Sequence, residues 1–347
     1  MSMGSGTAGN RPAPAVWFPA IRAGSGADVY TIRLVEGLNR IGVRAEIHWL
    51  PHRAEYAPFS VRAPAPPSWA NIIHVNSCTP KRFLPPGMPL VVTVHHAVHD
   101  PAYARYKTRL QDLYHRLWVR RVEGRNVRSA DHVVAVSRFT SQQTATCFDP
   151  CSMSVIPNWV DPLTYRPATR DAVDRPFRLL FVGNPSRRKG ADLLPAIMRR
   201  LGDAFELRCT AGLKRRAAAA EWPANMKLAG GIATDAEMVR CYQDSDALLF
   251  PSRLEGFGLA AVEAQACGLP VIATRGSAFP EVVQDGVTGF LCPQDDVDEF
   301  AGACRRLSSD PALWRRMSAA ARERAVTLFA PGMNLPRYVA CYERVLR

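Results

Sequence analysis

The feature that most constrains the fold is a double series of short apolar runs separated by stretches with helical spacing of apolar residues. The first series has runs at 15–18, 43–50, 71–75, 90–94 and 132–136. The second has runs at 177–182, 206–209, 226–228, 246–250, 271–273 and 289–291. Strands alternating with helices form mainly parallel sheets with helices on both faces. The sequence therefore predicts an α/β protein with two Rossmann-like, doubly wound domains facing a cleft.

A polar segment with Pro162, Pro167 and Pro176 separates the two series and indicates a linker. The 347 residues are also more than a single core usually accommodates. Ligands of such sheets bind beyond the carboxyl ends of the strands. We expect a disordered N-terminus at 1–11, a first lobe at 12–165, a linker at 166–176 and a second lobe at 177–334.

Composition narrows the class of protein. Hydrophobic residues make up 47% and charged residues 22%, which fits a globular chain. No stretch approaches 18 uninterrupted apolar residues, and residues 1–14 lack the pattern of a signal peptide. The nine cysteines are scattered singly and without zinc-type spacing. We therefore expect a cytoplasmic protein with reduced thiols.

The net charge of +13 is uneven, because residues 1–165 hold 18 basic and 10 acidic side chains and so contribute +8. All eight histidines also lie in this part, between His48 and His132. An excess of positive charge favours an anionic partner, which could be a phosphate ligand, a membrane surface or a nucleic acid.

Three segments at predicted strand ends carry groups suited to phosphates and sugars. In the first, Gly24 and Gly26 lie at a strand-to-helix turn and resemble part of a dinucleotide fingerprint, with Glu46 twenty residues beyond Gly26. Val29 replaces the third glycine of that fingerprint, so a simple tight turn is the main alternative. Either way, such a turn lets backbone N–H groups at a helix N-terminus approach a phosphate.

The second segment, residues 183–190, places Arg187, Arg188 and Lys189 just after a buried strand, where they would suit a pyrophosphate. The third, residues 251–272, places Glu263 in a helix that is apolar nearly all round. An unpaired carboxylate there would be costly. The two vicinal hydroxyls of a ribose would satisfy its oxygens.

The third segment also carries a resemblance. Glu255 and Glu263, eight residues apart, with the later segments 268–271 and 280–289, resemble the signature of the retaining glycosyltransferases of family 4. Residues 155–161 resemble a further segment of that family, with Trp159 in place of a glycine. The resemblance spans most of the chain and implies the GT-B fold, with a last helix at about 335–347 returning to the first lobe.

The resemblance also implies roles for individual residues. Glu263 would hold the ribose and Lys189 the pyrophosphate, while Gly26 would close over the phosphates. Glu255 would grip the transferred sugar, and Ile232 would lie near the base. Asn184 stands where many members have arginine, so Arg187 or Arg188 would supply that charge. Backbone N–H groups that would bind the sugar and its phosphate belong to Phe257, Gly258 and Leu259.

A histidine at the end of the fourth predicted strand would face the reaction centre in this family. We assign that role to His95, with His96 as the rival. Asp244 and Asp246, and likewise Asp296 and Asp298, fit the D-x-D pattern of metal-dependent transferases. We interpret Asp246 as the start of a strand and Asp296 as a helix cap, and we expect neither a metal ion nor a cofactor.

The segment 103–128 has a net charge of +6 and an apolar stripe that includes Leu110, Leu113 and Leu117. Such a helix could dock on an anionic bilayer through Arg116, Arg120 and Arg121. The alternative is a helix that packs into the core and keeps a solvated basic face. Under either interpretation we expect the apolar stripe to pack.

The resulting functional hypothesis is transfer of a sugar from a GDP- or UDP-sugar to a hydroxyl of a lipid-linked or surface-polysaccharide saccharide. The enzyme would act in the cytoplasm, as a peripheral protein of the inner membrane face. The alternatives are a sugar-nucleotide epimerase on the same architecture, or a transferase or binding protein acting on tRNA. No nucleic-acid-binding motif stands out, so we do not expect nucleic acid as a partner.

Overall fold

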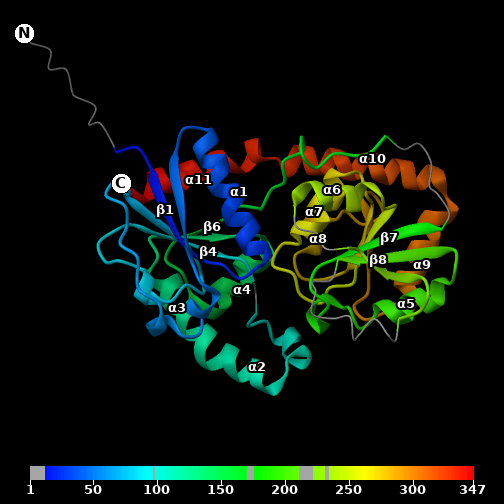
Figure 1. The fold of residues 1–347 in the computed structure, drawn as a ribbon, viewed down its shortest axis with the longest axis horizontal. Coiled ribbons are helices and arrows are strands. Elements are labelled where there is room, and N and C mark those ends of the chain that lie inside the picture. Colours follow the sequence, from blue (N-terminus) through cyan, green and yellow to red (C-terminus); the bar gives the residue numbers. More distant parts are fainter. Residues whose placement is uncertain (1–11, 97, 170–175, 211–221, 231–233) are drawn as a thin grey trace, which may run out of the picture.

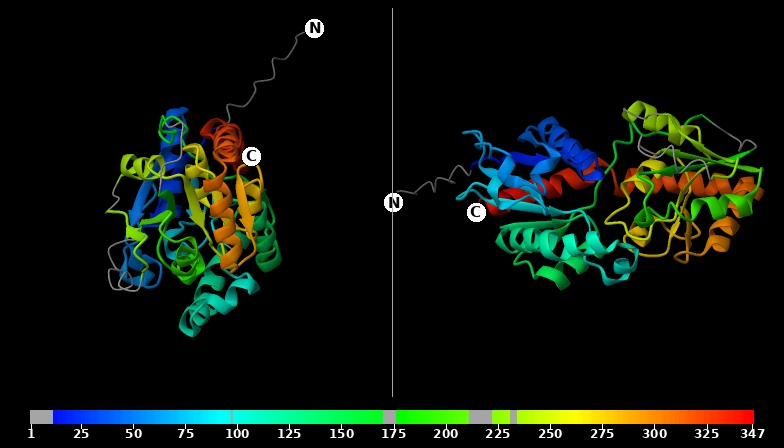
Figure 2. Two further views of the ribbon diagram at one scale, coloured as in Figure 1. Left: turned by 90° about the vertical axis from the view of Figure 1, so that its right-hand side faces the viewer. Right: turned by 60° about the horizontal axis from the view of Figure 1, so that its bottom comes forward.

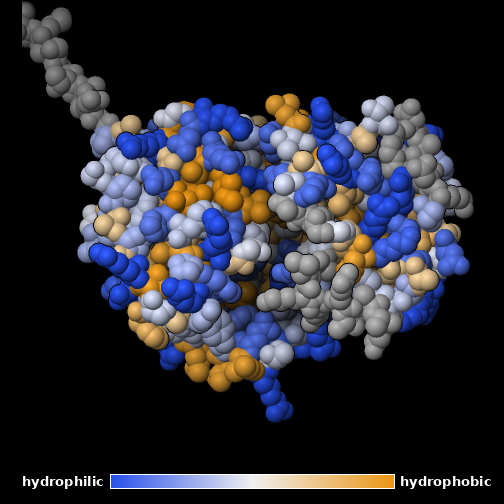
Figure 3. Space-filling model, viewed as in Figure 1, coloured by the Kyte–Doolittle hydropathy of each residue, from blue (hydrophilic) through white to orange (hydrophobic). Residues whose placement is uncertain are grey.

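The computed structural model describes residues 12–96, 98–169, 176–210, 222–230 and 234–347. It contains two six-stranded parallel sheets, each flanked by helices, in two lobes that lie side by side (Figure 1). The two Rossmann-like lobes predicted from the alternating pattern are thereby confirmed. The molecular surface is hollowed between them (Figure 3).

The sheet of the first lobe has the strand order β2-β1-β3-β4-β5-β6. Connections leave β1 and β3 in opposite directions, which makes their carboxyl ends a topological switch point. The three-residue strand β6 was not expected as a strand, because its pairing with β5 depends on tertiary contact. The elements are β1 (Ala15–Ile21), α1 (Gly26–Arg40), β2 (Arg44–Leu50), β3 (Ile72–Asn76), β4 (Leu90–Val94), α2 (Arg109–Tyr114), α3 (Arg120–Ser129), β5 (His132–Ala135), α4 (Arg138–Phe148) and β6 (Met153–Val155).

The sheet of the second lobe has the strand order β12-β11-β10-β7-β8-β9, with its switch point between β7 and β10. Strand β7 is a buried apolar run, as expected for a parallel strand covered on both faces. The elements are β7 (Phe177–Val182), α5 (Leu194–Leu201), β8 (Phe205–Thr210), β9 (Met226–Leu228), α6 (Asp235–Gln243), β10 (Ala247–Phe250), α7 (Leu259–Ala266), β11 (Val271–Thr274), α8 (Phe279–Val282), β12 (Gly289–Cys292), α9 (Val297–Ser309) and α10 (Pro311–Leu328).

The chain ends in helix α11 (Pro331–Val345), which packs along the first lobe (Figure 1). It starts four residues before the expected helix, with proline in its first turn. The Tyr30 hydroxyl donates to the Tyr338 hydroxyl at 2.7 Å, and His74 Nδ1 lies 2.7 Å from the Tyr342 hydroxyl. A segment more than 300 residues from β1 in sequence therefore completes the core of the first lobe.

The basic segment after β4 is not one long helix. It forms a 3-10 segment (Pro101–Tyr106), then α2, a π-helical turn (His115–Val119) and α3, with the Thr108 side chain capping α2. The expectation that the leucine stripe would pack is wrong, because Leu110, Leu113 and Leu117 are 78%, 52% and 49% exposed. Figure 2 shows the part of this segment that contains α2 projecting from the first lobe, whereas α3 packs against that lobe. None of the helices in the described ranges could cross a membrane.

Candidate active site

The switch point of the second lobe brings Lys189 and Glu255 together. A 3-10 turn (Arg187–Lys189) follows β7, and a loop follows β10. Gly190 has a φ of +68°, and a Cβ there would collide with the carbonyl oxygen of Pro251, so only glycine lets the two loops approach. As a result Lys189 Nζ lies 2.6 Å from Glu255 Oε1.

The Glu255 carboxylate is buried and strongly held. Burial alone would raise its pKa, but the charges of Lys189 and Arg188 outweigh that effect and lower the pKa to about 2. The Ser252 hydroxyl donates to the same carboxylate oxygen at 2.8 Å. Burial lowers the pKa of Lys189, although Glu255 opposes this. Glu255 is therefore an anion and a hydrogen-bond acceptor throughout the physiological pH range.

The remaining basic residues of this loop differ in where they point. Arg188 Nη1 donates to the Leu254 carbonyl at 2.9 Å and lies 3.5 Å from Glu255 Oε1. Arg187 and Asn184 are exposed. Of the two arginines considered as replacements for the charge missing at Asn184, Arg188 is the one in contact with Glu255.

Helix α7 begins at the same edge of the sheet. Gly258 is its N-cap, with a φ of +92° that favours glycine, and Phe257 is buried beside it. Leu259 is the first helical residue. The first hydrogen bond within the helix is made by the N–H of Ala261 to the Gly258 carbonyl, so the N–H groups before it, at the start of α7, can bind an anion.

Glu263 lies one turn further along α7 and is 7% exposed, so it is not a surface glutamate. Its carboxylate already has protein partners. Arg33 Nη2 of the first lobe donates to Oε1 at 2.7 Å, and the Tyr242 hydroxyl donates to Oε2 at 2.9 Å. Ribose hydroxyls are therefore not needed to satisfy this carboxylate, contrary to the sequence-based expectation, although it keeps acceptor capacity for them.

Sequence reasoning missed Arg33 and Tyr242. Arg33 lies next to the buried face of α1, and its neighbours in sequence look like those of any amphipathic helix. Tyr242 is the last residue but one of α6, where it is one of several apolar residues. Neither has a local signal, because their contact with Glu263 joins segments from 21 to 230 residues apart.

The two rival histidines have different surroundings. His95 is buried in the first lobe, with Nε2 2.9 Å from Asn76 Oδ1 and its ring edge-on to Tyr30. Burial, with repulsion from His96, holds the pKa of His95 well below its usual value. His96 is exposed, but the parts of both lobes near its ring partly desolvate it, and this effect, with repulsion by Arg188, lowers the pKa of His96 to about 4. Both rings are neutral at pH 7.

The glycine turn of the first lobe leads into α1. The Asp28 carboxylate accepts hydrogen bonds from the N–H groups of Ala23 and Gly24, at 3.0 and 2.8 Å, which shapes the turn. A side chain on Gly26 would meet no atom within 4 Å, so this position is open. Ile232, expected near the base, lies outside the described residues.

The lobes meet beside Glu255. A Cβ on Gly256 would collide with the carbonyl oxygen of His95, so the two backbones are in contact there. The hydroxyls of Ser137 and Thr140 donate to the Gly256 carbonyl at 2.5 and 2.9 Å. The Glu281 carboxylate accepts from two N–H groups at the start of α4, both at 2.8 Å.

The D-x-D patterns serve structural ends. Asp246 is fully buried just before β10, and its carboxylate accepts from the N–H of Arg178 at 2.7 Å. The Asp296 side chain caps α9, as the sequence predicted. Within the described ranges, no group of three or more His, Cys, Asp or Glu side chains could hold a metal ion.

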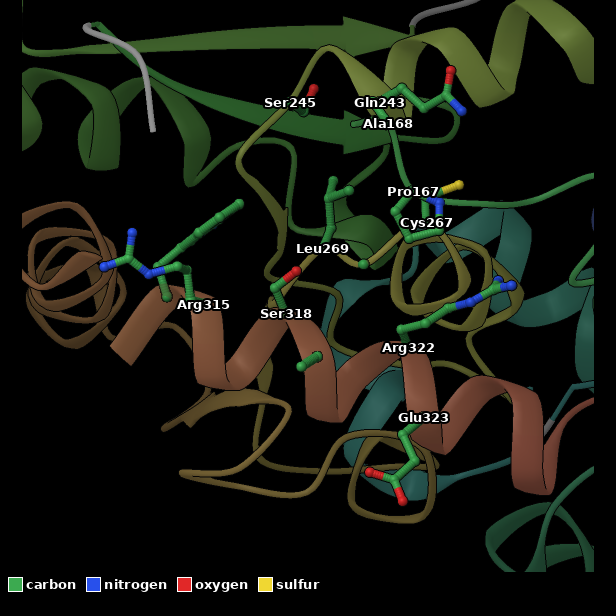
Figure 4. Close-up of a pocket in the computed structure, with 13 residues that line it drawn as sticks. Pro167, Ala168, Gln243, Ser245, Cys267, Leu269, Arg315, Ser318, Arg322 and Glu323 are labelled. Carbon is green, nitrogen blue, oxygen red and sulfur yellow. The ribbon is translucent and has the colours of Figure 1, made fainter. Parts of the chain in front are cut away.

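A pocket of about 600 Å³ lies elsewhere, between α10 and the segment that links the lobes (Figure 4). It lies at the amino ends of β10 and β11, since Ser245 and Leu269 precede these strands. Arg322 lines it, but its guanidinium already donates to the carbonyls of Pro162, Tyr165 and Ala266. Ligands of doubly wound sheets bind at the opposite, carboxyl edge, so this pocket is not the candidate active site.

Two facing Rossmann-like lobes, each built on a six-stranded parallel sheet, define the GT-B fold. Family models agree: the one for Glycosyltransferase Family 4 matches residues 48–162, and the one for Glycosyl transferases group 1 matches residues 167–324. The chain belongs to this family and is a nucleotide-sugar-dependent glycosyltransferase.

Individual relatives show the same likeness. The chain is 30% identical to an MMP alpha-(1->4)-mannosyltransferase of Mycolicibacterium hassiacum over 300 residues, 80% of this chain and 71% of that one. It is also 30% identical to a D-inositol 3-phosphate glycosyltransferase of Pseudarthrobacter chlorophenolicus over 264 residues, covering 69% of this chain and 61% of the relative, which is less than two thirds of its length.

Solved structures show the fold. A sucrose-phosphate synthase of Thermosynechococcus elongatus superposes with a TM-score of 0.79 at 19% identity, over 96% of this chain and 99% of the other. HepE of Anabaena, in complex with UDP and glucose, superposes with a TM-score of 0.72 at 17% identity, over 96% of this chain and all of the other.

Proposed function

We propose that this enzyme transfers a sugar, with retention of configuration and without a metal ion, from a GDP- or UDP-sugar to a saccharide hydroxyl. The acceptor saccharide is lipid-linked or part of a surface polysaccharide. The observation that carries the proposal is the buried Glu255 carboxylate held by Lys189 and Arg188 at the switch point. A carboxylate that can accept from sugar hydroxyls, next to two cations that suit a diphosphate, supports this proposal.

In the proposed reaction the bond from the anomeric carbon to the β-phosphate oxygen breaks, and a bond to the acceptor oxygen forms on the same face. The acceptor's proton passes to the leaving phosphate oxygen. Lys189, Arg188 and the N–H groups at the start of α7 stabilise the charge that develops on the diphosphate. Glu255 positions the sugar, and its low pKa makes it unsuited to donate a proton. His95 contacts the sugar or acceptor from the first lobe.

The donor and the role of Glu255 can be tested together. A thermal-shift screen of UDP, GDP and their sugars identifies the donor. Glu255→Gln should then lower kcat far more than it weakens affinity for the bare nucleoside diphosphate, because Glu255 meets the sugar. Equal losses in both quantities would contradict this division of roles.

Metal independence has a separate test. Activity should survive excess EDTA, whereas Lys189→Ala should remove most of it, because a cation then no longer faces the diphosphate. Loss of activity on chelation with recovery on addition of manganese would contradict a reaction without metal.

The surface of α2 and of the π-helical turn that follows it supports an acceptor held at a membrane. Leu110, Leu113 and Leu117 are exposed at the three- and four-residue spacing of one helix face. Exposed arginines surround this stripe, and Figure 3 shows apolar atoms at the edge of the molecule where Figure 1 places α2. They are Arg109, Arg116, Arg120 and Arg121. Apolar side chains within a basic rim suit the headgroup region of an anionic bilayer.

Sedimentation with vesicles tests this surface. Wild-type protein should sediment with anionic vesicles at low salt and less with neutral ones. Changing Arg116, Arg120 and Arg121 to glutamine should weaken binding roughly a hundredfold, at about 1 kcal/mol per basic side chain. Arg315 and Arg316, exposed on α10, supply the matched control. Equal recovery with both lipids would favour an acceptor in solution.

A further inference from the structure

One guanidinium joins three parts of the chain beside Glu263. Arg33 lies in the middle of α1 in the first lobe, and its Nη2 lies 2.7 Å from Glu263 Oε1 in α7 of the second lobe. The same nitrogen lies 2.9 Å from the hydroxyl of Tyr165, in the segment that links the lobes. Only 13% of the Arg33 side chain and 9% of the Glu263 side chain are exposed. The pair is therefore a buried contact between lobes.

This contact fixes the Glu263 carboxylate. Arg33 bonds one oxygen and Tyr242 the other, so the carboxylate cannot rotate freely. An ionised carboxylate has about four lone-pair sites, so about two remain for further hydrogen bonds. That number matches two vicinal hydroxyls. Arg33 also neutralises a charge that would otherwise be buried in an apolar helix with one neutral partner.

We propose that Arg33 is a positioning residue that sets the affinity for the nucleoside diphosphate part of the donor, acting through Glu263. This inference rests on the proposed function, in which Glu263 accepts hydrogen bonds from the ribose. Because Arg33 belongs to α1, whose first turn holds Gly26, the contact also ties the glycine turn of the first lobe to the ribose-binding helix of the second. The Arg33–Glu263 pair therefore bridges the two lobes at this end of the cleft.

The direction of the effect follows from the geometry. Arg33 and the ribose would use different lone pairs of Glu263, so Arg33 prepares the carboxylate and does not compete with the ligand. Its loss should weaken nucleotide binding by about tenfold to hundredfold, the usual scale for one hydrogen bond to a charged group. KM for the donor should rise by a similar factor, while kcat at saturating donor should change much less.

The test is a double-mutant cycle measured by calorimetry with UDP and GDP, on wild type, Arg33→Met, Glu263→Gln and the double variant. Methionine keeps an apolar stem and removes the charge. In the wild-type background, Arg33→Met should weaken nucleotide binding by about tenfold to hundredfold. In the Glu263→Gln background, the same change should weaken binding by less than about threefold. Arg33→Lys keeps a positive charge and should recover part of the nucleotide affinity. If Arg33→Met does not fold, Arg33→Lys takes its place in the cycle.

Arg322→Met is the matched control. Arg322 also joins the linking segment to α7, but its guanidinium donates to backbone carbonyls. Arg322→Met should lower thermal stability and change nucleotide affinity little, both in the wild-type background and in the Glu263→Gln background. Tighter or unchanged binding by folded Arg33→Met, or equal weakening in both backgrounds, would overturn the inference alone. A wild type that binds neither nucleotide would instead contradict the proposed function on which the inference rests.

Discussion

At the scale of single residues, the contact between the lobes depends on an absent side chain. Gly256 directly follows Glu255, and its backbone touches that of His95. Ser137 and Thr140 hold its carbonyl in place from the first lobe. Gly256 therefore lets the Glu255 carboxylate, which we propose binds the sugar, approach His95 at the end of β4.

Gly256→Ala should abolish most of the activity, because the new Cβ would push the lobes apart. Each lobe keeps its own core, so the variant should stay folded. Activity and circular dichroism together check this. Gly302→Ala in α9 is the matched control, since a Cβ there meets nothing within 4 Å and alanine is the better helix former. Full activity in Gly256→Ala would show that the closed contact is not needed.

At the scale of elements, α11 is a C-terminal helix that stabilises the N-terminal lobe. Tyr338 is fully buried, bonded to Tyr30 and packed against Trp159 at 5.8 Å between ring centroids. Helix α11 thus links the end of the second lobe to the core beneath β1 and β3.

Tyr338→Ala should destabilise the first lobe by about 3–5 kcal/mol, the usual cost of removing a buried aromatic ring. Hydrogen exchange should show lost protection in β1, β3 and β4, with the second lobe largely unchanged. Met333, 55% exposed on the same helix, gives the control variant Met333→Ala, expected within about 0.5 kcal/mol of wild type. Uniform loss of protection in both lobes would contradict a local role for α11.

At the scale of the whole molecule, the lobes differ in their response to acid. All eight histidines lie in the first lobe, and burial lowers the pKa of His74 to about 3 and that of His115 to about 4. The pKa values of His95, His96 and His132 are lowered as well. Since each folded-state pKa lies below the unfolded value of 6.5, the unfolded chain binds more protons in acid.

Stability of the first lobe should therefore fall as the pH drops from about 6.5 toward 4. The lowered pKa of His74 alone should reduce the free energy of unfolding by on the order of 2 kcal/mol at pH 5. The melting temperature should fall less steeply with decreasing pH in His74→Gln than in wild type. The control His48→Gln, which changes an exposed residue, should show the same slope as wild type. Hydrogen exchange at pH 5 should show the first lobe opening before the second. The reverse order would contradict this asymmetry.

Local sequence patterns specify the two α/β series, most strand positions and the charged loops after β7 and β10. They do so because a parallel strand covered on both faces requires a local apolar run, and a loop at a strand's end follows directly from it. Lys189, Glu255 and Glu263 were identifiable for the same reason: each lies within a few residues of a recognisable strand or helix start. The cap on α9 is likewise local.

Which side chains meet depends on how distant parts of the chain pack. Arg33 and Glu263 are 230 residues apart, and Tyr30 and Tyr338 are 308 apart, so no periodicity or spacing could indicate either contact. Tertiary packing also decides that the leucine stripe of α2 and the π-helical turn is exposed, because amphipathic spacing is the same whether a face meets a core or water. Partners between lobes depend on how two independently formed sheets pack, and this information is distributed over the whole chain.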